Sequence, residues 1–219
     1  MSDKVHTKFA ELEAELSELR RENASLKTQV SELNELAQRD PLTGIGNRRA
    51  FEHRLEVELN RTWRSRCPTC LMLFDIDRLK SVNDSLGHAA GDAVISGLAR
   101  LLDASTRSLD SVFRIGGDEF AIVLSASGIE SGMKVSDRIL RASNTGMQWQ
   151  GENISTSAAV GMASISIDGM GKSELLILDT RTLKKVDEGF RGGKAEAFGA
   201  LMNAADKALY AEKARGSDV

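Results

Sequence analysis

The residues best suited to chemistry are acidic and lie in two short segments, Asp75–Asp77 and Gly116–Glu119. The first follows the apolar run Cys70–Phe74, and the second is the centre of Arg114–Phe120, which reads RIGGDEF. Two carboxylates held close together repel each other unless a cation lies between them, and hard oxygen ligands favour Mg²⁺ or Mn²⁺ over zinc. Glycines beside such acids let a ligand approach the backbone closely. The pattern indicates a site for a divalent cation and phosphate oxygens.

The flanking residues predict how these acids are positioned. Short apolar-leaning segments lie on both sides of Gly116–Gly117, which predicts a β-hairpin with the glycines at its tip. Asp75 stands where a strand over 70–76 should leave the core. If that strand and the hairpin are neighbours in one sheet, Asp75 and Asp118 converge. The alternative is that the aspartates only cap a turn.

A polar stretch over 78–92 follows the first acidic segment. Its Lys80 is suited to phosphate, while Asn83 and Asp92 offer amide and carboxylate groups that can read a purine edge. Guanine suits a carboxylate because its N1–H and N2–H₂ donors face the acceptor, whereas adenine presents an acceptor there. A guanine nucleotide is therefore the expected ligand.

Hydrophobic periodicity predicts the elements that carry these groups. The expected helices cover 48–66, 90–104, 130–144 and 197–214, and the expected strands cover 70–76, two parts of 111–124, and 153–164. The order β-α-β-β-α-β predicts an α+β fold, an α/β sandwich of the ferredoxin-like βαββαβ type.

A heptad pattern occupies residues 1–39. Its apolar seam is Phe9, Leu12, Leu16, Leu19, Asn23, Leu26, Val30, Leu33 and Ala37. Leucine at each d position with a single asparagine, Asn23, at an a position favours two strands in fixed register. In a parallel pair the flanking neighbours are opposite in charge, namely Lys8 with Glu13, Glu15 with Arg20, and Glu22 with Lys27. An N-terminal coiled-coil helix that forms a parallel homodimer is predicted; a single helix folded back on the domain is the alternative. Pro41 should end the helix near Asp40, so the second domain covers 40–219.

The bulk composition excludes several classes. A chain of 219 residues with 41% hydrophobic residues and a net charge of −3 fits one globular domain with an appendage and lacks the basic footprint of a duplex nucleic acid binder. The sequence shows neither a run of 18 apolar residues nor a secretory signal, so no membrane association and a cytoplasmic location are expected. The cysteines of Cys67–Cys70 are expected to serve packing and loop roles; a redox pair or half a zinc site is the alternative.

Four motifs, in this order along the chain, resemble the GGDEF family of diguanylate cyclases over residues 40–216. They are Asp40–Gly44 with Asn47–Arg49, the stretch Asp75–Asp92, the RIGGDEF hairpin, and Ala205–Tyr210 with Lys213. The resemblance implies a nucleotidyl-cyclase-type domain. In such enzymes two GTP molecules, one on each protomer, condense to cyclic di-GMP and release two pyrophosphates.

The same resemblance implies roles for individual residues. Asp75, the Ile76 carbonyl and Asp118 would hold Mg²⁺ or Mn²⁺, and Asp118 or Glu119 would help to deprotonate the 3′-hydroxyl. Asn83 and Asp92 would read guanine. The groups that would bind phosphates are the side chains of Lys80 and Lys213 and the backbone of Arg78 and Leu79.

A second constellation, Arg107–Asp110, precedes the hairpin and has the spacing RxxD. It resembles the family's inhibitory site for the product, with Arg138 as a further contact by family position. Arginine can bond the O6 and N7 acceptors of guanine, and the aspartate can meet its donors. Product inhibition is therefore expected; an ordinary surface ion pair is the alternative.

The chain departs from the family pattern at two places. Ser217 replaces a phosphate-binding arginine, and the segment 168–199 is longer than the usual connection, which predicts either an extra packed element or a mobile flap. Two other functions stay open: a catalytically silent dimer that senses GTP or cyclic di-GMP, and a coiled-coil scaffold.

Overall fold

A computed structural model describes residues 2–143, 146–154, 157–168, 173–179, 184–187, 190 and 192–216 of the chain. The chain divides into two compact units, Met1–Arg39 and Asp40–Val219. Among the described residues, no helix combines the length and the apolar character needed to cross a membrane.

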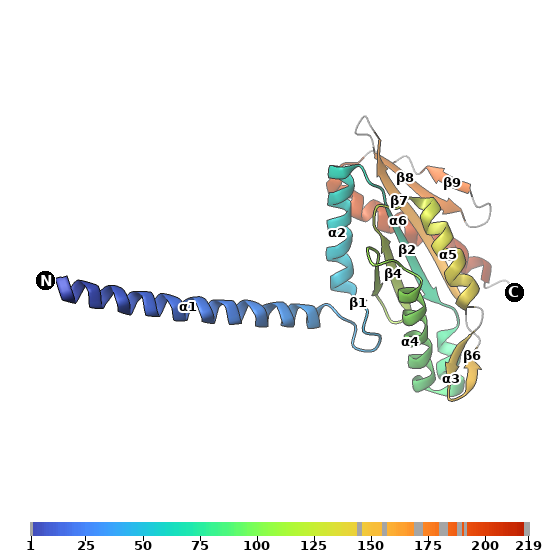
Figure 1. Cartoon of the computed structure of the whole chain (residues 1–219). Helices are drawn as coiled ribbons and strands as arrows, with labels where there is room; N and C mark the ends of the chain where they lie inside the picture. The colour runs from blue at the N-terminus through green and yellow to red at the C-terminus, as the bar shows by residue number, and fades with distance from the viewer. Residues whose placement is uncertain are drawn as a thin grey trace. The chain divides into compact units, whose positions relative to one another are not determined.

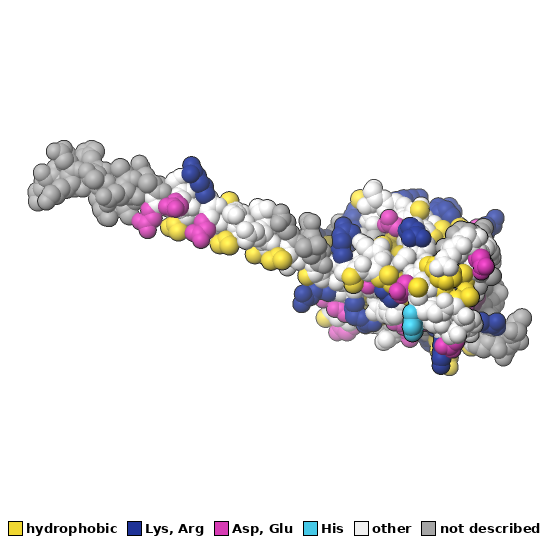
Figure 2. All heavy atoms as spheres, turned by 90° about the horizontal axis from the view of Figure 1, so that it is seen from below, with side chains coloured by type: hydrophobic (Ala, Val, Ile, Leu, Met, Phe, Trp, Pro, Cys, Tyr) yellow, Lys and Arg dark blue, Asp and Glu magenta, His cyan; other side chains and the backbone are white. Residues whose placement is uncertain are grey.

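The first unit is one helix, α1, which spans Ser2–Ala37. It contains no glycine or proline and ends shortly before Pro41, whose ring disfavours helical geometry in the preceding residue. Its seam leucines are exposed in the single chain, for example Leu19 at 55% and Leu26 at 51%. Figure 2 shows hydrophobic side chains gathered along the lower side of the described part of this helix. The side chains of Phe9 and Leu12 lie outside the described residues.

The second unit is built on a mixed sheet, and its described strands have the order β1-β3-β4-β2-β7-β8-β9 (Figure 1). The strands are β1 Gly46–Asn47, β2 Thr69–Ile76, β3 Ser111–Arg114, β4 Glu119–Leu124, β7 Ala158–Ile167, β8 Ser173–Asp179 and β9 Lys184–Asp187. Within it, β3-β4-β2-β7 is the ferredoxin-like arrangement of β-α-β-β-α-β, so the predicted α+β fold is confirmed.

Two layers of helices cover the sheet (Figure 1). One layer holds α2 and α6, and the other holds α3, α4 and α5. Their bounds are α2 Arg48–Ser65, α3 Leu79–Leu86, α4 His88–Ala104, α5 Ile129–Ser143 and α6 Lys194–Gly216. Every residue of β2 is buried, with Leu71 and Leu73 facing the first layer and Met72 and Phe74 facing the second. Full burial of a side chain such as Phe74 stabilises the fold by about 1.5–3 kcal/mol.

Two segments differ from the sequence expectation, and a third, 168–199, contains the extra packed element that was one of its two predicted alternatives. The strand expected over 153–164 is split into β6, Glu152–Ile154, which pairs with β5, Met147–Trp149, and the longer β7. Part of the polar stretch after β2 is helical as α3, because Leu79, Val82 and Leu86 follow helical spacing. The long segment 168–199 supplies extra packed strands, β8 and β9, because Leu175 and Leu178 are buried against the sheet.

Candidate active site

The predicted convergence of the two acidic segments is present in the sheet. β2 and β4 pair antiparallel, with Phe74 opposite Phe120 and Asp75 opposite Glu119. One residue further on, the Ile76 N–H donates to the Asp118 carbonyl at 3.2 Å. Asp118 therefore lies beside the C-terminal end of β2, close enough for its charge to act on the Asp75 carboxylate.

The tip of the hairpin is in contact with the backbone and the side chain of Glu119. The N–H groups of Ile115 and Gly116 both donate to the Glu119 carbonyl, at 2.9 and 3.3 Å, which closes the predicted hairpin. A Cβ atom at Gly116 would lie 2.2 Å from Glu119 Oε2, so the Glu119 carboxylate lies directly over this glycine. At Gly117 a Cβ would meet nothing within 4 Å, which leaves the backbone open to a ligand.

Asp75 is 6% exposed, and its surroundings act on its pKa in opposite directions. Burial raises the pKa of Asp75, a hydrogen bond from Lys213 lowers it, and the charge of Asp118 raises it, with a raised pKa as the net result. The Lys213 ammonium, carried by α6, lies 2.6 Å from Asp75 Oδ2. The family resemblance assigns Lys213 to phosphate, and sequence reasoning missed this direct contact with the acid.

The donor chemistry fits a hard divalent cation. The two carboxylates and the Ile76 carbonyl are oxygen donors, and Mg²⁺ is usually held by one or two carboxylates together with substrate phosphates and water. Among the described residues no cluster of three or more His, Cys, Asp or Glu side chains forms a complete metal cage. The Lys213 ammonium already shows that the Asp75 carboxylate accepts a positive charge at this position.

The two residues expected to read guanine come from consecutive helices. Gly87, at a φ of +87°, ends α3 and begins α4, so the chain turns back sharply between them. The Asn83 side chain lies directly over Gly91, where a Cβ atom would be 2.0 Å from Asn83 Oδ1. Because Asp92 is the next residue, the fold brings Asn83 and Asp92 to the same end of the helix pair.

The N-terminus of α3 is open to phosphate. Arg78 caps the helix in the left-handed conformation, with a φ of 56° and no side-chain hydrogen bond to the helix end. Lys80 is exposed in the first turn, while Leu79 is buried and fixes the helix on the core. Helix N-termini present free N–H groups and a positive dipole to anions.

Two arginines that the sequence analysis did not assign hold the backbone of the Gly116–Gly117 hairpin. Arg114 donates to the Gly117 carbonyl, at 2.8 and 3.2 Å, and forms an ion pair with Asp40 at 3.3 Å. Arg48 Nε donates to the Ile115 carbonyl at 2.7 Å. Burial raises the pKa of Asp40, but hydrogen bonds from Thr43 and the charge of Arg114 outweigh it, so the pKa is lowered.

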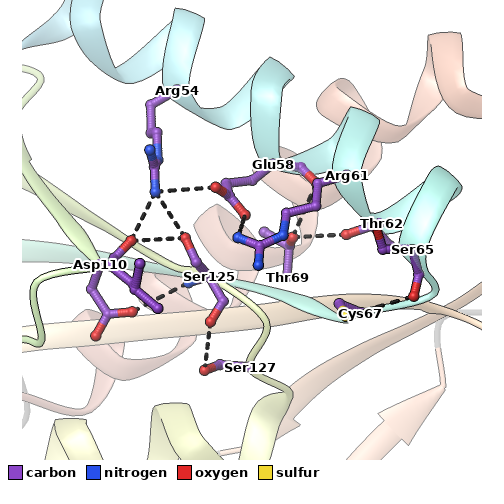
Figure 3. Close-up of polar contacts among 11 residues, drawn as sticks. Arg54, Glu58, Arg61, Thr62, Ser65, Cys67, Thr69, Asp110, Ser125 and Ser127 are labelled. Atoms are coloured by element: carbon purple, nitrogen blue, oxygen red, sulfur yellow. Dashed lines mark hydrogen bonds and ion pairs between the residues drawn. The ribbon is translucent and has the colours of Figure 1, made fainter.

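The RxxD segment forms a closed turn. Arg107 N–H donates to Asp110 Oδ2 at 3.1 Å, and Asp110 N–H donates to the Arg107 carbonyl at 2.9 Å. Ser125 N–H, just after β4, donates to Asp110 Oδ1 at 3.2 Å (Figure 3). Arg138, on α5, donates to the Ser105 carbonyl, so all three predicted product-binding residues lie in one region.

Cys70 is buried in β2, and Cys67 is half-buried in the loop before it. Both are free thiols, and burial raises the pKa of Cys70 to about 12. Ser217 lies outside the described residues, so the family position that it occupies has no structural account.

A ferredoxin-like sheet with acids where β2 ends beside β4, and with glycines at the tip of the adjacent hairpin, defines a nucleotidyl-cyclase-type domain. Residues 37–187 match the family model described as diguanylate cyclase, GGDEF domain. The chain belongs to the GGDEF-domain diguanylate cyclase family.

Curated relatives and solved structures agree with this membership. The chain is 38% identical over 156 residues to diguanylate cyclase TpbB of Pseudomonas aeruginosa strain UCBPP-PA14, which covers 70% of this chain and 34% of the relative. It is 33% identical over 180 residues to diguanylate cyclase DgcP of Pseudomonas aeruginosa PAO1. This alignment covers 82% of this chain and 23% of DgcP. The chain thus spans about a third or less of these relatives.

Among solved structures, diguanylate cyclase SiaD of Pseudomonas aeruginosa, crystallised with its activator SiaC, matches with a TM-score of 0.69 and 28% identity over 98% of this chain and 73% of SiaD. The coiled coil and GGDEF domain of DgcB from Caulobacter crescentus, in complex with c-di-GMP, matches with a TM-score of 0.70 and 24% identity over 94% of this chain and 95% of that one. The second likeness concerns the fold alone.

Proposed function

We propose that this protein is a diguanylate cyclase that condenses two GTP molecules to cyclic di-GMP and two pyrophosphates. The observation that carries the proposal is the pairing of β2 with β4. At the end of β2 the Ile76–Asp118 backbone hydrogen bond sets Asp75 beside the GGDEF acids. The reaction is an in-line attack of a 3′-oxygen on an α-phosphorus, so positioning and charge neutralisation are what the protein must supply.

Each half of the nucleotide has a counterpart in the fold. Asn83 and Asp92 take the guanine edge at the α3–α4 turn, and the α3 N-terminus with Lys80 takes phosphate oxygens. Lys213 is close enough to Asp75 to balance phosphate charge next to the metal ligands.

Asp75, the Ile76 carbonyl and Asp118 would hold Mg²⁺ or Mn²⁺, which when bound neutralises phosphate charge and lowers the pKa of the attacking hydroxyl. Asp118 or Glu119 accepts the proton of the 3′-hydroxyl. Arg114 and Arg48 hold the hairpin backbone, so the acids keep their place while the proton moves.

Each domain carries half of a symmetric reaction, so two copies have to meet. The exposed α1 seam, in which Leu33 is 64% exposed, supplies the contact as a parallel coiled coil over 1–39. The domain over 40–219 follows directly, which raises the effective concentration of the two active sites. The RxxD turn with Arg138 binds cyclic di-GMP and limits synthesis when product accumulates.

The test is incubation of the purified chain with GTP and Mg²⁺, followed by chromatography of the products. Cyclic di-GMP should form, and Asp118→Asn should reduce its rate at least about 100-fold. Asp103→Asn, an exposed aspartate on α4, is the matched control and should leave the rate unchanged. If the wild type binds nucleotide without turnover, the function is that of a sensor dimer and not of a cyclase. If the wild type shows no binding and no turnover, the function is that of a scaffold.

A further inference from the structure

The RxxD turn is held from outside by a residue far away in the sequence. Arg54, on α2, donates from Nη2 to the Leu109 carbonyl at 2.8 Å. The same nitrogen donates to Ser125 Oγ at 3.0 Å (Figure 3). Leu109 stands inside the turn, between Arg107 and Asp110. Its side chain is 61% exposed, so the turn is anchored through its backbone and not through the packing of this side chain.

Arg54 is itself held by a buried acid. Glu58, one helical turn further along α2, lies 3.1 Å from Arg54 Nη2, and its side chain is only 3% exposed. Arg61 is more distant, with 3.8 Å between Nη1 and Glu58 Oε2. A buried carboxylate without a close partner is strongly destabilising, so Glu58 holds the Arg54 guanidinium firmly against the turn.

The contacts of Arg54 close a network around one peptide group. Ser125 Oγ donates to the Leu109 carbonyl at 2.9 Å, and Ser125 N–H donates to Asp110 Oδ1 at 3.2 Å. The Leu109 carbonyl and the Asp110 N–H belong to the same planar peptide unit. Fixing the direction of that carbonyl therefore fixes the direction in which the Asp110 backbone leaves the turn.

From this geometry we infer that Arg54 is a positioning residue for the product-binding turn and that Glu58 acts through Arg54. The inference rests on the proposed binding of cyclic di-GMP at Arg107 and Asp110. Neither α2 residue contacts the ligand; each sets the orientation of the turn before the ligand arrives. A preorganised turn binds more tightly because it does not pay ordering entropy on binding.

Calorimetric titration of the full chain with cyclic di-GMP tests the inference directly. Arg54→Gln should raise Kd at least about tenfold, since charge-assisted bonds to the turn are lost. The initial rate with GTP, measured before product accumulates, should stay close to the wild type. The thermal midpoint should fall, because Glu58 loses its close partner. Arg64→Gln, an exposed arginine of the same helix, is the matched control and should bind as the wild type does.

A double-mutant cycle separates positioning from general destabilisation. Glu58→Gln should weaken cyclic di-GMP binding in the wild-type background but have no further effect in Arg54→Gln. Independent, additive effects would overturn the relay. Should Arg54→Gln not fold, Arg54→Lys decides: a Kd raised severalfold supports the inference, and a wild-type Kd refutes it.

The outcome for the proposed product site is read separately, from Arg107→Ala. If the wild type binds no cyclic di-GMP, or Arg107→Ala binds it normally, the turn is not the product site and the premise fails. If Arg107→Ala abolishes binding while Arg54→Gln binds normally, the premise stands and only the positioning role of Arg54 is wrong.

Discussion

The contact between Gly91 and Asn83 allows the proposed guanine recognition to be tested without touching a polar group. In Gly91→Ala the added Cβ would lie 2.0 Å from Asn83 Oδ1 and 2.9 Å from its Cγ. The clash is with the end of a side chain, so Asn83 can rotate away while α4 keeps its path. The substitution therefore removes the amide from its place and leaves Asp92 and the backbone where they are.

The expected size follows from the hydrogen bonds that Asn83 would make to the base. Leaving one polar group of a bound guanine without its partner costs about 1–3 kcal/mol, which lowers kcat/KM for GTP by about 5- to 150-fold. The helix itself should not suffer, because alanine is about 1 kcal/mol more favourable than glycine inside a helix. Substrate recognition and stability should thus change in different directions.

Initial rates of cyclic di-GMP formation at several GTP concentrations, with a thermal melt of each variant, measure both quantities. Gly199→Ala is the matched control, because Gly199 is also inside a helix and a Cβ there meets nothing within 4 Å. It should raise stability and leave kcat/KM unchanged. An unaltered kcat/KM in Gly91→Ala would refute the role of Asn83 in reading guanine.

Three further variants test the fold, the ion pair of Asp40 and the coil. Gly161→Ala would place a Cβ 2.2 Å from the Ala205 carbonyl of α6. The free energy of unfolding, measured in urea, should therefore fall by at least about 1–3 kcal/mol. A free energy equal to that of the wild type would contradict the close packing of α6 on β7. Because the pKa of Asp40 is lowered in the fold, its charged form stabilises the protein above about pH 4. The difference in stability between the wild type and Asp40→Asn should therefore close as the pH falls further. Unfolding curves at several pH values would show this. Leu26→Lys puts a charge into the exposed seam of α1, so light scattering should report monomers and the turnover per chain should fall; a dimer of full activity would refute the coiled-coil interface.

The fold was predictable where periodicity and turn chemistry agree. The apolar run before Asp75 and the glycine pair between two short strands both give local signals, and the register that joins them follows from the order of elements. The approach of Asp75 to Asp118 could therefore be predicted from the sequence. The roles of these residues belong to the proposed function.

The contacts that sequence reasoning missed join residues far apart along the chain. Arg114 with Asp40, and Arg54 with Leu109, are separated by 74 and 55 positions, and no local pattern indicates which of many arginines will find a buried acid or a carbonyl. The segment 168–199 was left open between a packed element and a mobile flap for a different reason. A short apolar patch such as Leu175–Leu178 suits a strand or a buried helix equally, and only its pairing with β7 decides.

The strand β4 connects the two proposed sites physically. Glu119 begins it beside the metal ligands, and Ser125 follows its last residue and holds the RxxD turn. Because β4 is hydrogen-bonded to β2 on one side and β3 on the other, and is buried beyond Glu119, it has little freedom to deform between its ends. A ligand bound at the turn therefore does not displace the acids by deforming β4. Product inhibition in such a domain should act on how two domains approach each other, since the reaction needs both half-sites and each half-site is internally stiff.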